Sequence, residues 1–421
     1  MTFTSEKLLV VVGRAVDAIG SLVFLKMLAT LASKSDVGTY LLAASFLALL
    51  LTVSFSALDQ GLLRNVTEYR QQAALAECYS AMLVAYLGLA LLLAGVAAGA
   101  VLAFDIGEAL QGVMVPLVLW FALDALKNLN LTVASGLRSR GLIALASAAD
   151  YGCRLALLWA AYSWMRVSST VIVGLLAAAS LLATSVFVWG NRNLLSRFPW
   201  SRVRTTLLAS FHFAWPMMIW GLFGWLQNMS NRWLLSRYAD LSVVAEYGVL
   251  VAIASFPVTA VLGLVVTYTV PILYERESAV AGSSRKVVVR VAALLSPLCA
   301  ALVLVAALWH RELVILLSGP GYVENSHVLP FLMAAASASA ICSVLTYAIF
   351  AQRRLSSLLI ANISPGLLGL VLGYFAVSRF QFEGAILTLA TTQLIAAMLF
   401  TVAFVRSGRL VTSNALKQPL L

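Results

Sequence analysis

The chain carries little charge. Asp, Glu, Lys and Arg make up 11% of its 421 residues, whereas they make up about 25% of an ordinary soluble domain. Hydrophobic residues account for 62%, and the mean hydropathy is +0.96. A chain of this length with so few polar side chains cannot cover a soluble surface. The composition therefore indicates a protein that lies mostly within a membrane.

Motifs for metal binding and redox chemistry are also missing. The four cysteines and three histidines are scattered along the chain, without a C-x-x-C pair or the spacing of a metal site. We expect the cysteines to be reduced and buried. These absences argue against a metalloenzyme, and no cofactor is expected.

Long hydrophobic runs are abundant instead. Each is about 20 residues or longer, which is enough to cross a bilayer as a helix. The first run is too long for a signal peptide and contains Arg14, Asp17 and Lys26, so we interpret it as a permanent helix. Twelve runs can be placed, at about 8–32, 38–63, 79–104, 113–137, 142–165, 168–190, 209–235, 243–273, 287–309, 328–351, 355–377 and 384–405.

The basic residues are sorted by side of the membrane. With a cytoplasmic N-terminus, 18 of the 28 Lys and Arg residues fall on the cytoplasmic side and 5 on the outer side, and the other 5 are embedded. This asymmetry follows the positive-inside rule and predicts that both termini are cytoplasmic. It also explains the pI near 9.7 without nucleic-acid binding. The five outer residues are Lys34, Arg166, Arg237, Arg311 and Arg379.

A weak internal repeat divides the chain into two halves. SDVGTY at 35–40 and SVVAEY at 242–247 open the second and eighth predicted helices, 207 residues apart. We therefore predict a six-helix bundle over residues 1–190, a basic amphipathic cytoplasmic linker over 191–208, and a second six-helix bundle over 209–421. With six helices per half, the substrate path would run between the halves.

The five embedded basic residues lie close to acidic ones. A charge at the bilayer centre costs about 2.5–3.5 kcal/mol even on a lenient scale, so such residues usually pair or line a polar cavity. Arg14 with Asp17 and Asp150 with Arg154 have helical spacing suited to ion pairs. Ion pairing and a cavity that receives an anion are both open interpretations, and Lys26 can also reach the interface. The predicted cavity residues of the first half are Arg14, Asp17, Lys26, Asp124, Lys127, Asn128, Asp150 and Arg154.

The seventh predicted helix adds a second group of polar and aromatic residues. Tryptophan beside amides and arginine can bind a sugar, because aromatic rings pack on apolar sugar faces while amides bond to hydroxyl groups. Core packing and the interfacial aromatic belt are the alternative explanations. The candidate residues are Trp225, Asn228, Asn231 and Arg232.

Two stretches resemble a known family. Residues 13–69, with Arg14 in the first helix, SDVGTY ending at Tyr40 and LDQGLLRNV around Gly61, resemble the start of bacterial polysaccharide flippases. These are the Wzx-type branch of the multidrug/oligosaccharidyl-lipid/polysaccharide (MOP) exporter superfamily. Residues 214–250 are similar too, although many relatives have Asp-Arg where this chain has Asn231-Arg232.

The resemblance implies an all-α fold of twelve transmembrane helices in two six-helix bundles, V-shaped and MATE-like. It implies translocation of a polyprenyl-pyrophosphate-linked oligosaccharide to the outer leaflet by alternating access through a cationic cavity. It also implies a bacterial inner membrane protein of lipopolysaccharide or exopolysaccharide biosynthesis. Membrane lipids, the glycan lipid and other polysaccharide assembly proteins would be its partners, and a proton or sodium gradient is a candidate energy source.

Two other functions fit the sequence less well. A cation-coupled multidrug exporter of the same fold would need more embedded carboxylates than bases, yet four acids (Asp17, Asp59, Asp124 and Asp150) face five bases. A polysaccharide polymerase or acyltransferase would need a larger outer loop or a His/carboxylate active site. We therefore expect a transporter and not an enzyme.

Overall fold

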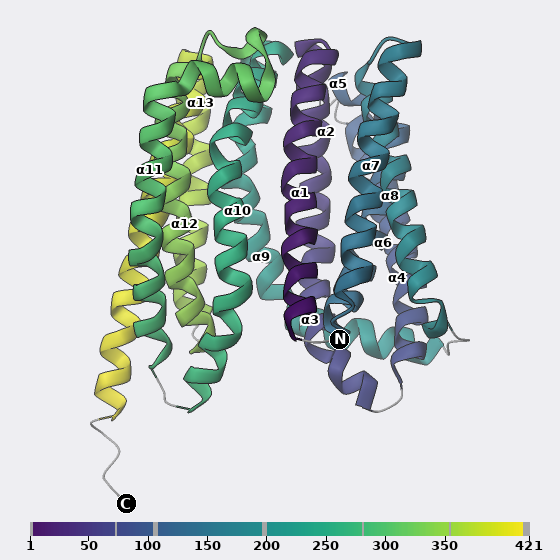
Figure 1. Cartoon of the computed structure of the whole chain (residues 1–421), viewed down its shortest axis with the longest axis vertical. Coiled ribbons are helices and arrows are strands. Elements are labelled where there is room, and N and C mark those ends of the chain that lie inside the picture. Colours follow the sequence, from purple (N-terminus) through teal and green to yellow (C-terminus); the bar gives the residue numbers. More distant parts are fainter. Residues whose placement is uncertain are drawn as a thin grey trace, which may run out of the picture. The chain divides into compact units, whose positions relative to one another are not determined.

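The computed structural model describes residues 3–71, 74–103, 108–195, 200–279, 282–352 and 355–415. Within these ranges the regular structure is entirely helical. The chain divides into two compact units, Met1–Leu222 and Phe223–Leu421. The expected all-α membrane fold is confirmed (Figure 1).

Unit 1 contains most of the shorter helices. Its elements are α1 (Phe3–Leu31), α2 (Lys34–Leu50), the π-helical turn η1 (Leu51–Phe55), α3 (Ser56–Gln71), α4 (Leu75–Ala103), α5 (Glu108–Gln111), α6 (Met114–Gly136), α7 (Arg140–Trp164), α8 (Ser169–Gly190) and the 3₁₀ turn η2 (Arg192–Leu194).

Helix α9 (Trp200–Tyr238) crosses from unit 1 into unit 2. It begins nine residues before the predicted seventh helix, so residues 200–208 of the predicted linker are helical, and 196–199 lie outside the described residues. Unit 2 continues with α10 (Leu241–Ala279), α11 (Ser284–Ser318), the 3₁₀ turns η3 (Pro320–Tyr322) and η4 (Ser326–Val328), α12 (Leu329–Ala351) and α13 (Leu355–Ala415).

The helices have the length and composition of membrane spans. In the described part of the chain, nine segments are long and apolar enough to cross a bilayer. The last of them, Leu358–Ser407, is interrupted at Gln381, whose φ of 45° and ψ of −113° divide α13 into two arms. Helices α1 and α9, with 29 and 39 residues, are also long enough at 1.5 Å per residue. Together these segments account for the twelve predicted helices.

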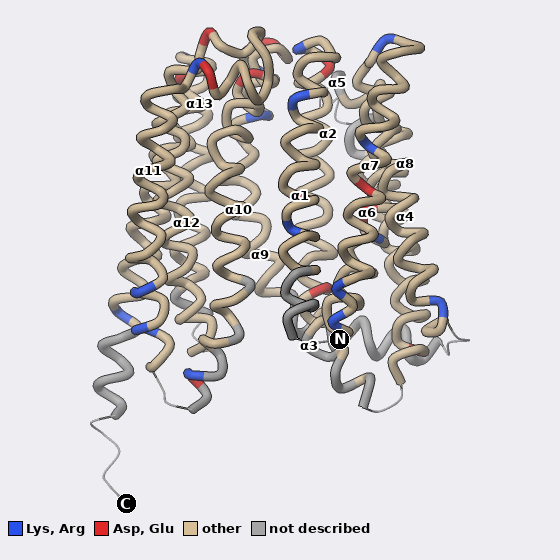
Figure 2. Tube along the Cα trace, viewed as in Figure 1, with Lys and Arg blue, Asp and Glu red and all other residues tan. Residues whose placement is uncertain are grey.

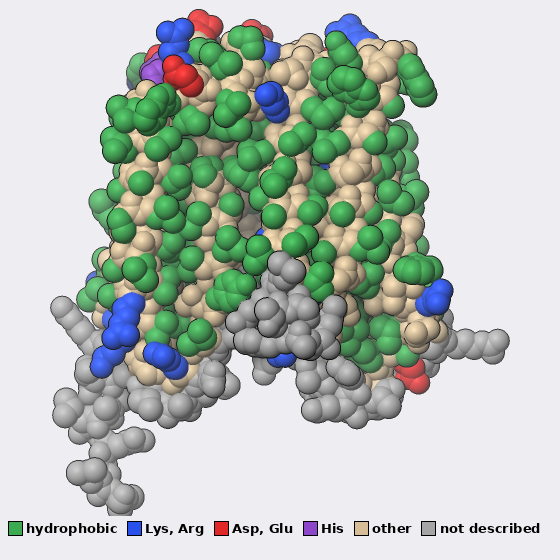
Figure 3. All heavy atoms as spheres, in the orientation of Figure 1, with side chains coloured by type: hydrophobic (Ala, Val, Ile, Leu, Met, Phe, Trp, Pro, Cys, Tyr) green, Lys and Arg blue, Asp and Glu red, His purple; other side chains and the backbone are tan. Residues whose placement is uncertain are grey.

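The outer surface of the helices is apolar, as a lipid-facing surface must be. Large exposed side chains such as Leu92, Leu294 and Ile360 are 63%, 76% and 69% accessible. The space-filling view shows hydrophobic side chains over the middle of the visible helices and charged ones near their ends (Figure 3). A soluble monomer rarely exposes so much apolar surface. The protein is therefore a multi-pass membrane protein.

In unit 1, α7 packs between α1 and α8, and α8 packs in turn on α6. Glycine permits the closest approach: a Cβ on Gly20 of α1 would lie 2.5 Å from Tyr151 Cγ of α7. Gly13 faces Ala144 of α7 at a looser distance, since its Cβ would lie 3.6 Å from the Ala144 Cβ. The two contacts are seven residues apart on α1 and also seven residues apart on α7, in the same chain direction. These two helices therefore run parallel.

The predicted repeat agrees with the helix positions. Helix α2 begins at Lys34 and α10 at Leu241, an offset of 207 residues. At the same offset, Phe24 contacts Tyr40 in unit 1 with ring centroids 6.3 Å apart, and Asn231 donates to Tyr247 Oη at 3.3 Å in unit 2. The same pair of helices is therefore joined at the same point in both units.

Replacing Gly20 by Ala should destabilise unit 1. The added Cβ would overlap the Tyr151 ring, and overpacking of this kind costs about 1–3 kcal/mol. Gly152→Ala in α7 is the matched control, since nothing lies within 4 Å of its Cβ position and alanine favours a helix by up to about 1 kcal/mol. Thermal unfolding of the purified protein in detergent measures both, and equal Tm values would contradict the close α1–α7 contact.

Candidate functional site: a charged network in unit 1

Most charged residues of the described chain lie near helix ends, but a few lie within the helices (Figure 2). The largest group of these joins the middle parts of α6 and α7. Four charged side chains from these two helices contact one another: Asp124, Lys127, Asp150 and Arg154. All four are among the predicted cavity residues.

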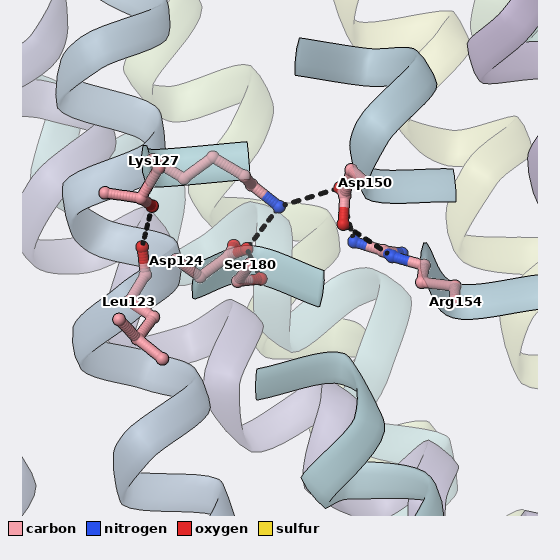
Figure 4. A network of polar contacts seen from close by, with 7 residues as sticks. Leu123, Asp124, Lys127, Asp150, Arg154 and Ser180 are labelled. Carbon is pink, nitrogen blue, oxygen red and sulfur yellow. Dashed lines mark hydrogen bonds and ion pairs between the residues drawn. The ribbon is translucent and has the colours of Figure 1, made fainter. Parts of the chain in front are cut away.

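Lys127 is the link between the two helices (Figure 4). Its ammonium Nζ lies 2.5 Å from Asp124 Oδ1, one helical turn away in α6, and 3.2 Å from Asp150 Oδ2 in α7. The side chains of Lys127, Asp124 and Asp150 are 15%, 14% and 9% accessible, so water screens these contacts weakly. The second contact is between helices and therefore depends on how α6 and α7 pack.

Asp150 holds a second cation through a two-point contact. Arg154 donates from Nε to Asp150 Oδ1 at 2.9 Å and from Nη2 to Oδ2 at 2.8 Å. Such fork-to-carboxylate pairs are among the strongest hydrogen-bonded contacts in proteins. The guanidinium also lies 5.0 Å from the centre of the Tyr151 ring. The Asp150–Arg154 pair that the four-residue spacing predicted is confirmed.

Helix α8 completes the site from the third side. Ser180 donates to Asp124 Oδ1 at 3.0 Å, and Thr184 donates to the Leu123 carbonyl at 3.3 Å. Ser180 is buried. Asp124 therefore has two partners, the Ser180 hydroxyl and the Lys127 ammonium. With two carboxylates and two cations, the four-residue network carries no net charge.

Helix α1 brings two further charges near this network. Asp17 accepts a hydrogen bond from Ser147 of α7, and its carboxylate is close enough to Arg14, Lys127 and Asp150 to interact with their charges. Arg14 is exposed. Arg14 and Asp17 thus interact through their charges, as their spacing suggested. The hydrogen bond of Asp17, however, comes from Ser147 of α7.

The register of α1 on α7 gives the depth of these charges. Asp150 and Arg154 lie at the middle of α7, which spans Arg140–Trp164. Gly13 of α1 lies beside Ala144 of α7, and the two helices run parallel. Arg14 is therefore level with the first third of α7, and Lys26 is level with its last third. Arg14 and Lys26 are 12 residues apart, or about 18 Å along the helix axis. Cationic groups therefore occur at three levels of the membrane segment of unit 1.

The remaining predicted residues have different surroundings. Lys26 is exposed, as interfacial reach would require, and Asn128 is partly buried. In unit 2, Asn231 is 1% accessible and donates to Tyr247 Oη and to the Ala385 carbonyl at 3.1 Å, so the structure places it in the interior of the unit. Asn228 is exposed, while Trp225 and Arg232 are half-buried.

Three residues of the site are not among those predicted from the sequence. Ser147 and Ser180 are partners of Asp17 and Asp124, and Tyr151 lies beside Arg154. Asp59 of α3, one of the four embedded acids named from the sequence, lies apart from these contacts; it is buried and accepts from Tyr86 Oη at 3.0 Å. Serine and tyrosine are common in apolar helices, so only the three-dimensional contacts single these residues out.

In the described part of unit 2, the corresponding helices carry no counterpart of the network. The fourth and fifth helices of the second half are α12 and the first arm of α13. Residues 329–351 contain no Asp, Glu, Lys or Arg, and residues 355–380 contain only Arg379. Unit 2 builds the same helix arrangement without these charges. The arrangement of helices therefore does not require the ion pairs of unit 1.

No protein-family model matches the sequence, and no curated protein matches it. Solved structures are similar in fold. One is "Lipid II flippase MurJ, inward closed conformation", with a TM-score of 0.75, 11% identity, and coverage of 94% of this chain and 87% of that one. Another is an inward-facing MATE family multidrug resistance transporter of the MOP superfamily, with a TM-score of 0.66, 16% identity, and coverage of 100% and 97%.

The outward-facing conformation of such a MATE transporter is also similar, with a TM-score of 0.67, 14% identity, and coverage of 98% and 95%. These matches extend over almost the whole of each chain. The chain has the fold of the MOP-superfamily transporters. The MATE-like fold that the sequence predicted is confirmed.

Asp150→Asn should be among the most destabilising single changes in this MOP-fold chain. It leaves Arg154 without a carboxylate in a buried site, and breaking a buried pair costs about 3–5 kcal/mol. Asp124→Asn should cost less, because Lys127 keeps Asp150 as a partner. Unfolding of the two purified variants in detergent measures the difference. A larger loss of stability for Asp124→Asn would refute the central role of Asp150.

Proposed function

We propose that the protein is a flippase that moves a polyprenyl-pyrophosphate-linked oligosaccharide from the cytoplasmic to the outer leaflet by alternating access. The observation that carries this proposal is the charged network at the middle of α6 and α7, which the corresponding described helices of unit 2 do not repeat. Ionisable residues at this depth of a membrane protein mark a functional site by default. The similarity in fold to a structure described as a lipid II flippase supports the same function.

The chemistry of the cationic residues suits a pyrophosphate. An arginine fork binds two phosphate oxygens at once, and a lysine ammonium adds a point charge. Arg14 lies at the first level that a headgroup from the cytoplasmic leaflet would meet, if the N-terminus is cytoplasmic. Arg154 and Lys127 come next, and Lys26 lies nearest the outer side. The substrate phosphates would pass these levels in that order while the polyprenyl chain stays in lipid.

The ion pairs give this site a resting state. In the ion-paired arrangement, Asp150 neutralises Arg154 and shares Lys127 with Asp124, so no uncompensated charge remains in the network. A pyrophosphate has enough negative charge to compete with Asp150 for the guanidinium. The network would then open when substrate binds and close again after release.

The other parts of this function follow from the resemblance to polysaccharide flippases, and the topology follows from the basic residues. The protein would act in a bacterial cytoplasmic membrane, with both termini cytoplasmic and the basic residues mainly on that side. Glycan assembly proteins would supply and consume the lipid-linked oligosaccharide, and a proton or sodium gradient would drive the exchange. The half-exposed Trp225 and the exposed Asn228 remain candidates for contact with the glycan.

A neutral double variant tests the functional role of the network. Asp150→Asn with Arg154→Gln removes one negative and one positive charge, so Lys127 keeps Asp124 and no charge is left unpaired. We expect translocation of lipid-linked oligosaccharide in proteoliposomes to fall at least about tenfold, since hydrogen bonds to charged groups contribute about 1.5–3 kcal/mol each.

Arg311→Gln is the control for this test, because Arg311 is exposed and distant in sequence from the network. Thermal unfolding verifies that the double variant is folded. Normal translocation by a folded double variant would show that the pairs serve only the stability of unit 1.

A cation-coupled drug exporter is the second candidate, because the MATE structures match this chain over its full length. Asp17 would be its cation site. If the flippase proposal holds, cells that produce the protein should not export a cationic dye, and Asp17→Asn should leave dye accumulation unchanged. Dye export that depends on Asp17 would favour the drug exporter instead.

A further inference from the structure

A groove in unit 2 lies outside the network described above. It is formed by the two arms of α13 where the helix turns back at Gln381, and its volume is about 360 Å³. Ligand pockets in proteins have volumes of about 300–1,000 Å³. The lining residues are Leu372, Phe375, Ala376, Arg379, Phe380, Leu387, Thr388 and Thr391.

The shape of the groove follows from the local sequence. Gly384 of the second arm lies directly on the Ala376 backbone of the first, where any Cβ would overlap the Ala376 carbonyl. Gln381 holds the turn in place by donating from Nε2 to the Tyr238 carbonyl at the end of α9, at 3.2 Å. The arms are also close where Thr388 and Thr392 face Gly373 and Gly369, and larger side chains border the open space beside these contacts.

The turn lies at a membrane surface. The segment Leu358–Ser407 is long enough for two crossings, and Gln381 divides it near its middle. Tyr238 and Tyr374 contact each other with ring centroids 6.1 Å apart, and Tyr374 contacts Phe375 at 5.4 Å. Aromatic residues of this kind are enriched at the level of lipid headgroups. The topology predicted from the basic residues makes this the outer surface.

The groove has one charged end and one apolar wall. Arg379 lies two residues before the turn, and Leu372 lies seven residues deeper, about 10 Å along the helix. Phe375, Phe380 and Leu387 are 57%, 60% and 61% accessible. Arg379 forms no ion pair within the described part of the chain, and Glu383 is not among the lining residues.

We propose that this groove binds a phospholipid with an anionic headgroup from the outer leaflet. The lipid phosphate would accept hydrogen bonds from the Arg379 guanidinium, and one acyl chain would lie along Leu372, Phe375 and Leu387. A membrane segment is always surrounded by phospholipid, and a basic residue at a membrane surface attracts anionic headgroups. The headgroup charge and the depth of the apolar wall both match this ligand.

Native mass spectrometry of the full chain in detergent tests the proposal, with phosphatidylglycerol and phosphatidylcholine as probes. Arg379→Ala should weaken phosphatidylglycerol binding about fivefold, the effect of one basic residue at an anionic surface. Arg311→Ala, an exposed arginine of the same predicted side, should leave binding unchanged. Thr391→Trp should also weaken binding, because it fills the groove while keeping Arg379.

Each other outcome overturns the proposal. Unchanged phosphatidylglycerol binding in Arg379→Ala or in a folded Thr391→Trp variant would exclude the groove as the site. If Thr391→Trp does not fold, Leu387→Trp takes its place in the test. Equal binding of phosphatidylcholine would remove the role of the anionic headgroup. Tighter binding of a polyprenyl pyrophosphate would assign the groove to the transported lipid, and dimers that dissociate in Arg379→Ala would assign it to a second copy of the chain.

Discussion

The carboxylate of Asp150 is the contact on which the charged site of unit 1 depends. It holds the Arg154 fork at 2.8 and 2.9 Å and lies 3.2 Å from the Lys127 ammonium, while only 9% of its side chain is accessible. A charge at this depth of a membrane is costly unless it is paired or lines a polar cavity. The packing of α6, α7 and α8 therefore has to keep these side chains within contact distance.

The two units show that this requirement is not general to the fold. Both contain the repeated contact between the same two helices, yet the buried polar residues of unit 2 are mostly amides and hydroxyls, with Glu246 as a buried carboxylate. Asn231 bonds to Tyr247 and Ala385, and Gln227 Nε2 donates to the Thr392 carbonyl at 3.2 Å. Neutral groups satisfy one another at little electrostatic cost. Because the helices of unit 2 that correspond to α6 and α7 pack without a charged network, the network of unit 1 is better explained by function than by folding.

The sequence predicted the parts of this arrangement that depend on one helix at a time. Length and hydropathy predicted twelve membrane helices, and a spacing of four residues predicted the Asp150–Arg154 pair. The contact from Lys127 to Asp150 could not be predicted, since it depends on the rotation of α6 against α7. Neither could the burial of Asn231, which results from the packing of α9 against α10 and α13. The start of α9 at Trp200 also differs from the predicted linker, because Arg202 and Arg204 lower the hydropathy without preventing a helix.

The neutral charged network and the exposed Arg14 together determine how an anion would interact with unit 1. Lys127 and Arg154 are already neutralised, so a weakly charged solute gains too little to replace Asp150 as their partner. Arg14 is exposed and is available before any ion pair opens. A multiply charged group such as a pyrophosphate can bind Arg14 first and still has charge left to compete for Arg154. Under the proposed function, selection by charge number would follow from having one exposed cation in front of two paired ones, without recognition of the attached sugar.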